Sequence, residues 1–372
     1  MKVWLLASRF EAGGIERVLV ALSQGLAKRG LDVSIVVGRI TTGGRVLLQE
    51  ATRAIEIAPG GAAYFPLGLM YHLRRWQPDV IITFAADIAV LALLLKSLGL
   101  IRSAVVCSEH SLSKAGGRIS SIGRAKRWLL HHFVRVFYPG ADALIAVSKG
   151  LAHELSSLVG EKSKCDCIYN PVSMPGAEDA SAAPPEDWPW PDDDVPVIIW
   201  IGRMEPVKRL DILVRAWQGL RSRMAVRLLL VGGGSQEQEL RSRLNHEADF
   251  FIAGVQSDPG SWLKKARVLV LSSDCEGFGN VLVEAMLCGV QVVSTACPYG
   301  PSEILDGGRY GQLVPPGDAR ALEEALEYSL DGIFRVDPDV LRARGAEFSA
   351  ENACASYFEV LQRVIRERGV AR

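Results

Sequence analysis

The sequence lacks a hydrophobic run long enough to cross a lipid bilayer. Its most apolar stretch, residues 88–95, ends at Lys96 and falls short of the roughly 20 residues that a membrane-spanning helix needs. The apolar stretch at residues 3–7 is too short for the core of a secretion signal, and Arg9 interrupts it. We therefore expect a cytoplasmic protein, with peripheral contact to the inner face of the plasma membrane as the alternative.

Net charge, paired cysteines and a dinucleotide-binding motif are missing as well. The chain has 42 basic and 42 acidic residues, so its composition gives no sign of nucleic-acid binding. Its seven cysteines are scattered, and Cys165 and Cys167 are too close for an ordinary zinc pair, so we expect reduced thiols. Residues 232–234 are three glycines but do not form Gly-x-Gly-x-x-Gly, which argues against a nicotinamide oxidoreductase.

What the chain does have is two series of short apolar runs that alternate with longer amphipathic ones. Such alternation predicts parallel sheets with helices on both faces, an α/β fold. Residues 173–195 between the two series are rich in Pro, Ala, Ser and Asp, which is typical of a linker, and we do not expect the aspartates at 192–194 to bind metal. We thus predict domains over residues 1–172 and 196–349, and a last helix within 350–372.

The stretch most indicative of function is Glu276-Gly277-Phe278-Gly279-Asn280-Val281-Leu282-Val283-Glu284, between an apolar run and a helical one. Gly277 and Gly279 permit a tight turn, and Asn280 is a good N-cap for the helix. Free N–H groups at a helix start attract phosphate. Glu276 and Glu284 would flank that phosphate, and carboxylates accept hydrogen bonds from vicinal hydroxyls. This arrangement suits a nucleotide sugar.

This stretch resembles the signature of the retaining family-4 glycosyltransferases of the GT-B fold, in which seven residues separate two glutamates. The resemblance extends over nearly the whole chain except the linker. It implies two doubly wound, Rossmann-like domains with the active site between them, and a C-terminal helix that packs back on the first domain. It also implies transfer of a sugar with retained anomeric configuration and no obligate metal or other cofactor.

Further residues in the second half match the family. Gly202, Arg203 and Lys208 follow a predicted strand, and two fixed cations there can neutralise a leaving diphosphate. Gly232 and Gly233 allow a nucleotide to approach closely. The resemblance implies that the backbone at Gly254 and Val255 meets the nucleobase, that Glu276 binds the hexose, and that Glu284 binds the ribose.

The first half carries weaker signals. Gly13-Gly14 lies between a strand and a helix, where the family has a segment that faces donor and acceptor. His110 follows another buried strand, and histidine is the commonest acid–base residue. The resemblance places such a histidine beside the reacting sugar. The alternatives are an ordinary loop at Gly13-Gly14 and a structural role for His110.

Charge is distributed unequally between the halves. Residues 1–172 hold 21 Lys and Arg against 12 Asp and Glu, a net charge of +9, and the rest of the chain carries −9. Much of the excess lies in residues 114–138, where basic residues accompany aromatic and aliphatic ones. This mixture suits an anionic membrane and a polyprenyl-linked acceptor. The alternatives are a solvated helix or an interaction with the acidic second half.

Taken together, we predict a glycosyltransferase that moves a hexose or N-acetylhexosamine from a nucleotide diphosphate sugar, UDP-linked, to a glycan or lipid-linked acceptor in polysaccharide synthesis. Two other classes fit the same motifs. One is an epimerase-like GT-B enzyme that changes a nucleotide sugar without an acceptor. The other is a protein that binds the nucleotide sugar without turnover.

Overall fold

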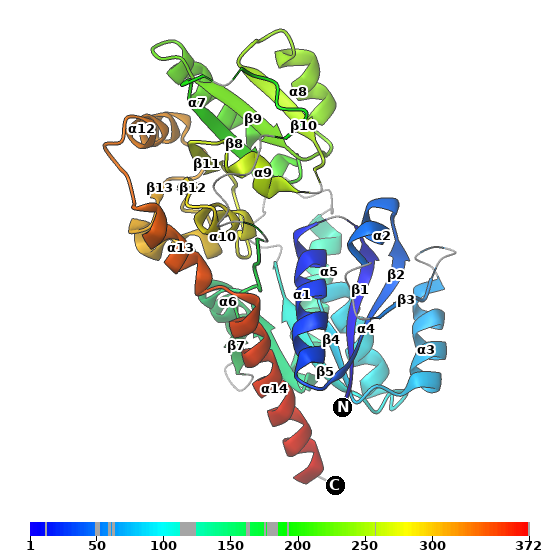
Figure 1. The fold of residues 1–372 in the computed structure, drawn as a ribbon. Helices are drawn as coiled ribbons and strands as arrows, with labels where there is room; N and C mark the ends of the chain where they lie inside the picture. The colour runs from blue at the N-terminus through cyan, green and yellow to red at the C-terminus, as the bar shows by residue number, and fades with distance from the viewer. Residues whose placement is uncertain are drawn as a thin grey trace. The chain divides into compact units, whose positions relative to one another are not determined.

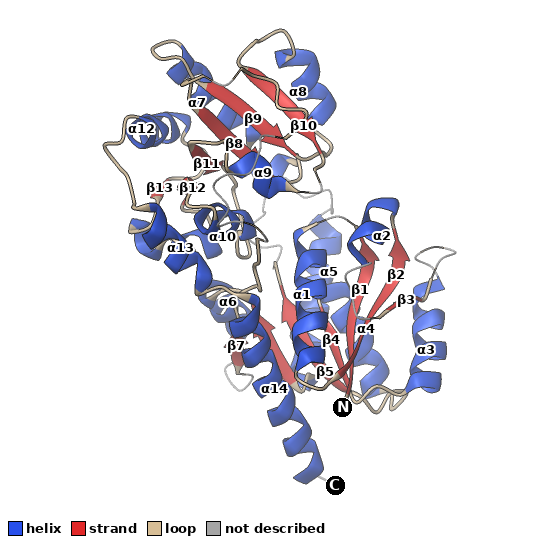
Figure 2. Cartoon of the chain, in the orientation of Figure 1, coloured by secondary structure: helices blue, strands red, loops and turns tan. Residues whose placement is uncertain are grey.

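The structure is a computed structural model that describes residues 1–11, 13–48, 53–58, 61, 64–111, 124–160, 164–174, 176, 185–191, 193–256 and 258–370. These residues form two compact units, coloured by position along the chain in Figure 1. The first unit contains the described residues of 1–172 and 348–370, and the second contains those of 173–347. Each unit is a parallel sheet accompanied by helices (Figure 2), which confirms the predicted α/β class.

The first unit is built on a seven-stranded sheet of order β3-β2-β1-β4-β5-β6-β7, in which every neighbouring pair is parallel. Its strands are β1 (Lys2–Phe10), β2 (Asp32–Ile40), β3 (Ala54–Glu56), β4 (Val80–Thr83), β5 (Ala104–Glu109), β6 (Ala143–Ala146) and β7 (Cys165–Cys167). Its helices are α1 (Gly14–Lys28), α2 (Thr42–Leu48), α3 (Phe65–Trp76), α4 (Ala86–Ser97), α5 (Arg124–Phe137), α6 (Lys149–Val159) and α14 (Ala350–Val370).

The C-terminal helix α14 belongs to the first unit and completes its core. Its apolar face carries Cys354, Tyr357 and Leu361, all at most 1% exposed, into the same cluster as Leu22 and Leu26 of α1. The central strands β4 and β5 are buried throughout because helices shield both faces of a doubly wound sheet. The sequence accordingly reads there as unbroken apolar runs rather than as alternating ones.

The second unit holds a six-stranded parallel sheet of order β10-β9-β8-β11-β12-β13. Its strands are β8 (Val197–Ile201), β9 (Arg227–Val231), β10 (Phe250–Gly254), β11 (Val268–Leu271), β12 (Gln291–Thr295) and β13 (Gln312–Val314). Its helices are α7 (Leu210–Arg221), α8 (Glu237–Leu244), α9 (Pro259–Leu263), α10 (Asn280–Leu287), α11 (Gly300–Ile304), α12 (Ala319–Leu330) and α13 (Pro338–Ala346).

The described end of the predicted linker is packed on the second unit. Trp188 and Trp190 meet edge to face with ring centroids 5.6 Å apart, and the Trp190 indole N–H donates to the Ala248 carbonyl at 2.9 Å. Asp193 accepts two hydrogen bonds from the Arg227 guanidinium, at 2.6 and 2.7 Å. This aspartate therefore holds the segment against β9.

Candidate active site

The predicted residues of the second unit gather at one edge of its sheet, where the parallel strands end. Backbone hydrogen bonds join the loops that follow three adjacent strands. The Met204 amide after β8 donates to the Gly233 carbonyl after β9 at 2.8 Å, and the Gly232 amide donates to the Gly254 carbonyl of β10 at 2.7 Å. Open parallel sheets bind ligands at this edge. Arg203 and Val255, on the same loops, are both exposed.

Gly232 is required by the closeness of these loops. Its φ is +131°, and a Cβ atom there would lie 1.9 Å from the carbonyl oxygen of Gly202. Any other residue would push the loops after β8 and β9 apart. The glycines at this edge thus bring two backbones together, which is a structural role that does not depend on a bound nucleotide.

Glu276 lies in the loop between β11 and α10 and is held from several sides. Its Oε1 accepts hydrogen bonds from the Lys208 ammonium and from the Ser273 hydroxyl, each at 2.6 Å. Its backbone pairs with the loop after β12, where its amide donates to the Pro298 carbonyl at 2.8 Å. The side chain is 12% exposed. Glu276 is therefore a fixed carboxylate at the sheet edge, and it can still be reached from outside.

Helix α10 begins one residue earlier than predicted. Gly279, not Asn280, occupies the N-cap position, with a φ of +107° that glycine adopts without strain. Asn280 is the first helical residue, so the prediction of an Asn280 side-chain cap is wrong. The left-handed glycine turns the chain directly into the helix, and the amides of Asn280 and Val281 belong to the first turn, where no carbonyl lies four residues earlier within the helix.

Glu284 is half-buried and lies one turn into α10, on the same face of the helix as Asn280. Phe278, in the preceding loop, is buried at 2% exposure and anchors the turn. The structure thus puts Glu276 before the start of α10 and Glu284 within it, with the first-turn amides between them in sequence.

Lys208 approaches this loop from the short helix η3 (Pro206–Lys208), between β8 and α7. The Ser272 hydroxyl donates to the Lys208 carbonyl at 2.8 Å, which fixes the backbone of η3 against the end of β11. The next residue, Arg209, has a φ of +52° and donates to Asp274 at 3.0 Å. The ion pairs of Arg209 with Asp211 and Asp274 raise the pKa of its guanidinium, so Arg209 serves to fasten the two loops to each other.

In the first unit, His110 is buried at 8% exposure immediately after β5. Its Nε2 lies 3.3 Å from the Ser108 hydroxyl, which is 2.7 Å from the phenol oxygen of Tyr357 on α14. Its Nδ1 is buried and has no hydrogen-bond partner among the described residues. Burial lowers the pKa of His110 to about 4, so the imidazole is uncharged at neutral pH.

Gly13 and Gly14 lie after β1, at the same end of the first sheet as His110. Gly13 is the N-cap residue of α1, with an extended backbone. The Glu16 side chain folds back over this turn, where its Oε1 accepts the Glu11 amide at 3.2 Å. A Cβ atom on Gly13 would lie 2.6 Å from Glu16 Oε2, so a side chain there would displace the glutamate.

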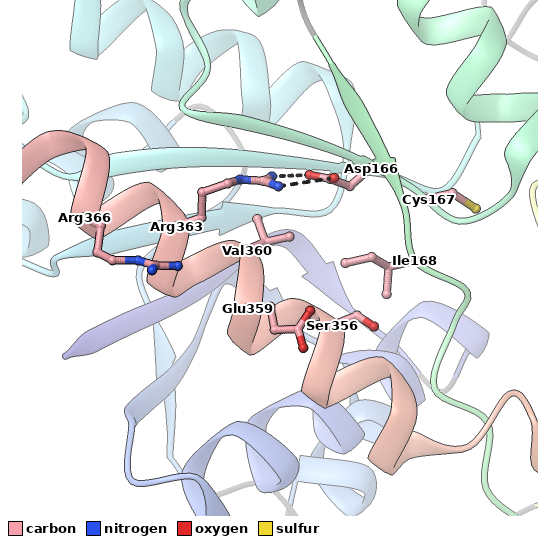
Figure 3. Close-up of a pocket in the computed structure, with 8 residues that line it drawn as sticks. All are labelled: Asp166, Cys167, Ile168, Ser356, Glu359, Val360, Arg363 and Arg366. Carbon is pink, nitrogen blue, oxygen red and sulfur yellow. Dashed lines mark hydrogen bonds and ion pairs between the residues drawn. The ribbon is translucent and has the colours of Figure 1, made fainter.

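A pocket of about 430 Å³ lies elsewhere in the first unit, between β7 and α14 (Figure 3). The Arg363 guanidinium binds the Asp166 carboxylate across it, and Arg366 and Glu359 add one charge of each sign. No residue predicted from the sequence lines this pocket. Its charges balance, so it offers no preference for an anionic donor.

The structure describes all seven cysteines, and none of them forms a disulfide. Within the described ranges, no three His, Cys, Asp or Glu side chains gather where they could hold one metal ion. No helix in the described part of the chain is long and apolar enough to cross a membrane.

Sequence reasoning missed the residues that hold the site together. Ser273 and Asp274 belong to the polar run that follows β11, and a polar run at the end of a buried strand was a usable signal. Ser108 and Tyr357 lie 249 residues apart, and their contact depends on how α14 packs. No pattern in the sequence could have paired them.

Two family models match the chain. One, described as Glycosyltransferase Family 4, matches residues 12–174, and the other, described as Glycosyl transferases group 1, matches residues 195–331. The chain belongs to these glycosyltransferases. This confirms the resemblance carried by the Glu276 and Glu284 motif.

Curated relatives of this glycosyltransferase include bacterial enzymes. The lipopolysaccharide core biosynthesis glycosyltransferase LpsE of Rhizobium meliloti is 27% identical over 362 residues, or 94% of this chain and 96% of that protein. An N-acetylgalactosaminyltransferase of Campylobacter jejuni that acts on N-acetylgalactosamine-N,N'-diacetylbacillosaminyl-diphospho-undecaprenol is 27% identical over 202 residues. That match spans 53% of this chain and about half, 53%, of the relative.

The fold is shared with solved structures. The structure of Anabaena HepE in complex with UDP and glucose superimposes with a TM-score of 0.77, at 18% identity, over 97% of this chain and 99% of the other. The two Rossmann-like units are therefore those of the GT-B fold, as predicted.

Proposed function

We propose that this protein is a retaining glycosyltransferase of bacterial cell-surface polysaccharide synthesis. It moves a hexose or N-acetylhexosamine from a UDP-linked donor to a hydroxyl of a glycan or lipid-linked sugar. The observation that carries the proposal is the loop from β11 to α10, where Glu276 is fixed by Lys208 immediately before the first-turn amides of the helix. A carboxylate, a cation and the N–H groups of a helix start match a sugar hydroxyl and a diphosphate.

The diphosphate of the donor binds the first turn of α10 and the cations of the loop after β8. Amides at a helix start favour phosphate oxygens. Lys208 supplies a point charge and Arg203 a planar fork, and Arg203 is exposed and so accessible to the ligand. These groups stabilise the charge that develops on the leaving diphosphate, which is the function that a divalent ion has in other transferases. We propose that no metal is required.

Glu276 binds hexose hydroxyls and Glu284 binds the ribose diol, while the backbone at Gly254 and Val255 meets the base. The bond between the anomeric carbon and the diphosphate oxygen breaks, and the acceptor oxygen bonds to that carbon on the same face. The acceptor proton leaves with the diphosphate. His110 takes part as a neutral hydrogen-bonding group, because burial holds its pKa at about 4 and an imidazolium would not persist at neutral pH.

The comparisons support the donor and the acceptor classes. HepE was crystallised with UDP and glucose and also with UDP-glucose, which favours a UDP-linked donor for a chain of the same fold. The Campylobacter jejuni relative acts on a diphospho-undecaprenol glycan, which favours a lipid-linked acceptor. Retention of configuration is supported by the two glutamates that seven residues separate.

A panel of nucleotide sugars, each incubated with polyprenyl-diphosphate-linked and soluble glycan acceptors, tests this proposal. We expect one donor to give a product heavier by one sugar residue in the mass spectrum, with release of the nucleoside diphosphate. Conversion of a donor into an isomeric nucleotide sugar in the absence of acceptor would instead identify an epimerase-like enzyme. Donor binding without any product across the panel would point to a non-catalytic protein.

A further inference from the structure

Helices α3, α4 and α5 of the first unit cover the same face of its sheet, together with α6, which connects β6 to β7. Helix α3 connects β3 to β4, α4 connects β4 to β5, and α5 connects β5 to β6, and all three connections advance in one direction across the sheet. Helix α1 connects β1 to β2 in the opposite direction. Because crossovers between parallel strands are right-handed, α3, α4 and α5 lie together on the face opposite α1. Figure 2 shows the helices of this unit around its sheet.

Exposed apolar side chains are concentrated on this face. Of the sixteen large apolar side chains that are exposed in the described part of the chain, ten lie on or next to α3, α4 and α5. We call these the α3–α5 face, and they are Tyr64, Leu67, Tyr71, Leu94, Leu98, Leu100, Trp128, Leu129, Phe133 and Val136. A soluble monomer rarely concentrates so much apolar surface without a partner for it.

The spacing of these residues shows that the helices present stripes and not scattered side chains. On α5, Trp128, His132 and Val136 recur every four residues, and the rings of Trp128 and His132 stack with centroids 5.7 Å apart. Trp128 is 69% exposed, whereas Val134 of the same helix is 1% exposed and packs inward. The helix therefore has a second apolar side that its own unit does not cover.

The second stripe, on α3, repeats the pattern. Leu67 and Tyr71 are 68% and 63% exposed and lie four residues apart, with Tyr64 three residues before Leu67. Leu69 and Leu73, between and after them, are buried in the unit. Two separate helices of one face thus show the same outward apolar stripe.

Charge indicates what covers these stripes. Helices α3, α4 and α5 contain seven Lys and Arg residues and one acidic residue, Asp87. Arg74, Arg75 and Arg135 are exposed beside the apolar stripes. Exposed tryptophan and tyrosine among cations suit the boundary between lipid headgroups and acyl chains, and cations there attract anionic headgroups. A second copy of the same face would bring like charges together.

We propose that the α3–α5 face docks on an anionic lipid bilayer. The side chains of Trp128, Phe133, Leu67 and Tyr71 enter the headgroup boundary, and the arginines bind lipid phosphates. This proposal rests on the proposed function only for the reason to dock, because a lipid-linked acceptor lies at the membrane surface. Its physical basis is independent of catalysis.

Vesicle co-sedimentation of the full chain tests the docking. Phosphatidylcholine vesicles with and without phosphatidylglycerol are compared for wild type, Trp128→Ser/Phe133→Ser and Leu67→Ser/Tyr71→Ser. We expect wild type to bind the anionic vesicles, and each double variant to bind them at least roughly tenfold more weakly. Transfer of one large apolar side chain from water into the membrane favours binding by more than a factor of about ten. Arg74→Glu/Arg75→Glu should lose the preference for phosphatidylglycerol.

Matched controls separate docking from folding and from catalysis. Ile333→Ser/Val340→Ser removes two exposed apolar side chains of the second unit, 71% and 47% exposed, and should bind vesicles as wild type does. Sugar transfer to a soluble acceptor without vesicles should be equal in all the variants. If wild type binds vesicles but transfers no sugar, the proposed function fails and the docking stands.

Two results would overturn the docking proposal. One is that wild type ignores anionic vesicles, and the other is that the serine variants on the α3–α5 face bind them as wild type does. If wild type ignores the vesicles and forms a dimer in sedimentation velocity that Trp128→Ser/Phe133→Ser dissociates, the face is assigned to a second copy of the chain.

Discussion

Lys208 and Glu276 form an ion pair, 2.6 Å between Nζ and Oε1, although 68 residues separate them in the sequence. The pair joins the loop after β8 to the loop after β11, so it links the cation that we assign to the diphosphate with the carboxylate that we assign to the hexose. In the absence of donor, each charge stabilises the other at a half-buried position, with side-chain exposures of 24% and 12%.

Removal of the cations should lower transfer. Lys208→Ala and Arg203→Ala each lose a charge-assisted contact with the leaving diphosphate, worth about 1.5–3 kcal/mol, so we expect kcat/KM to fall roughly tenfold or more. Lys208→Ala should be the more harmful, because it also leaves the Glu276 carboxylate without its cation. Arg320→Ala, a change at an 88% exposed residue of the second unit, is the control and should keep wild-type kinetics.

The same two cations should make the reaction independent of metal. Steady-state rates measured after treatment with a chelator should match the untreated rates, because Lys208, Arg203 and the first-turn amides of α10 stabilise the diphosphate. Complete loss of activity with chelator, followed by recovery with Mg²⁺ or Mn²⁺, would show that the cations do not suffice.

The two glutamates should affect different parts of the donor. Glu284→Ala should weaken binding of free UDP, because it removes the partner of the ribose diol, whereas Glu276→Ala should spare UDP and weaken the intact nucleotide sugar. In each case the affinity measured by titration calorimetry should fall roughly tenfold or more. Glu324→Ala, on the outer surface of the second unit, serves as the matched control. Equal losses for both ligands in both variants would contradict this division.

Stability of the first unit should depend on pH through Glu109. This carboxyl is 1% exposed, accepts a hydrogen bond from the Tyr138 phenol, and has its pKa raised to about 8, chiefly by burial. Glu109 releases its proton near pH 4.5 in the unfolded chain and near pH 8 in the folded chain. The contribution of Glu109 to the free energy of unfolding is therefore full below pH 4.5, and it is lost as the pH rises toward 8.

Glu109→Gln keeps the acceptor for Tyr138 and removes the titration. Urea unfolding at pH 5 should give similar stabilities for wild type and variant. At pH 8 the variant should be the more stable by a few kcal/mol, since each pH unit in this window is worth about 1.4 kcal/mol. A difference that does not change between the two pH values would contradict a protonated, buried Glu109.

Much of the fold followed from local patterns. The buried strands β4, β5, β8 and β11 are short apolar runs next to amphipathic helices. Such runs predict parallel sheets, and this prediction does not depend on which side chains form the site. The Glu276 motif was identifiable because a fixed spacing of two carboxylates places both near one helix start. Asn280 was misplaced by one position, because cap preference favours asparagine but the left-handed turn at Gly279 decides where the helix begins.

What could not be predicted depends on packing over long distances. The His110–Ser108–Tyr357 series requires α14 to lie on the first unit, and the Lys208–Glu276 pair requires β8 and β11 to be neighbours in the sheet. The basic stretch at residues 114–138 could be tested only in part, because residues 112–123 lie outside the described residues. Its described helix α5 exposes an apolar stripe that charge counting alone did not show.

The most direct test of retaining glycosyl transfer is the anomeric configuration of the product. With the donor found in the panel, the product of a single-turnover reaction is examined by proton NMR, and the coupling constant of the new anomeric proton is compared with that of the donor sugar. The account predicts the same configuration in donor and product, and loss of that product in Glu276→Ala. An inverted anomeric centre, or an unchanged yield in Glu276→Ala, would contradict it.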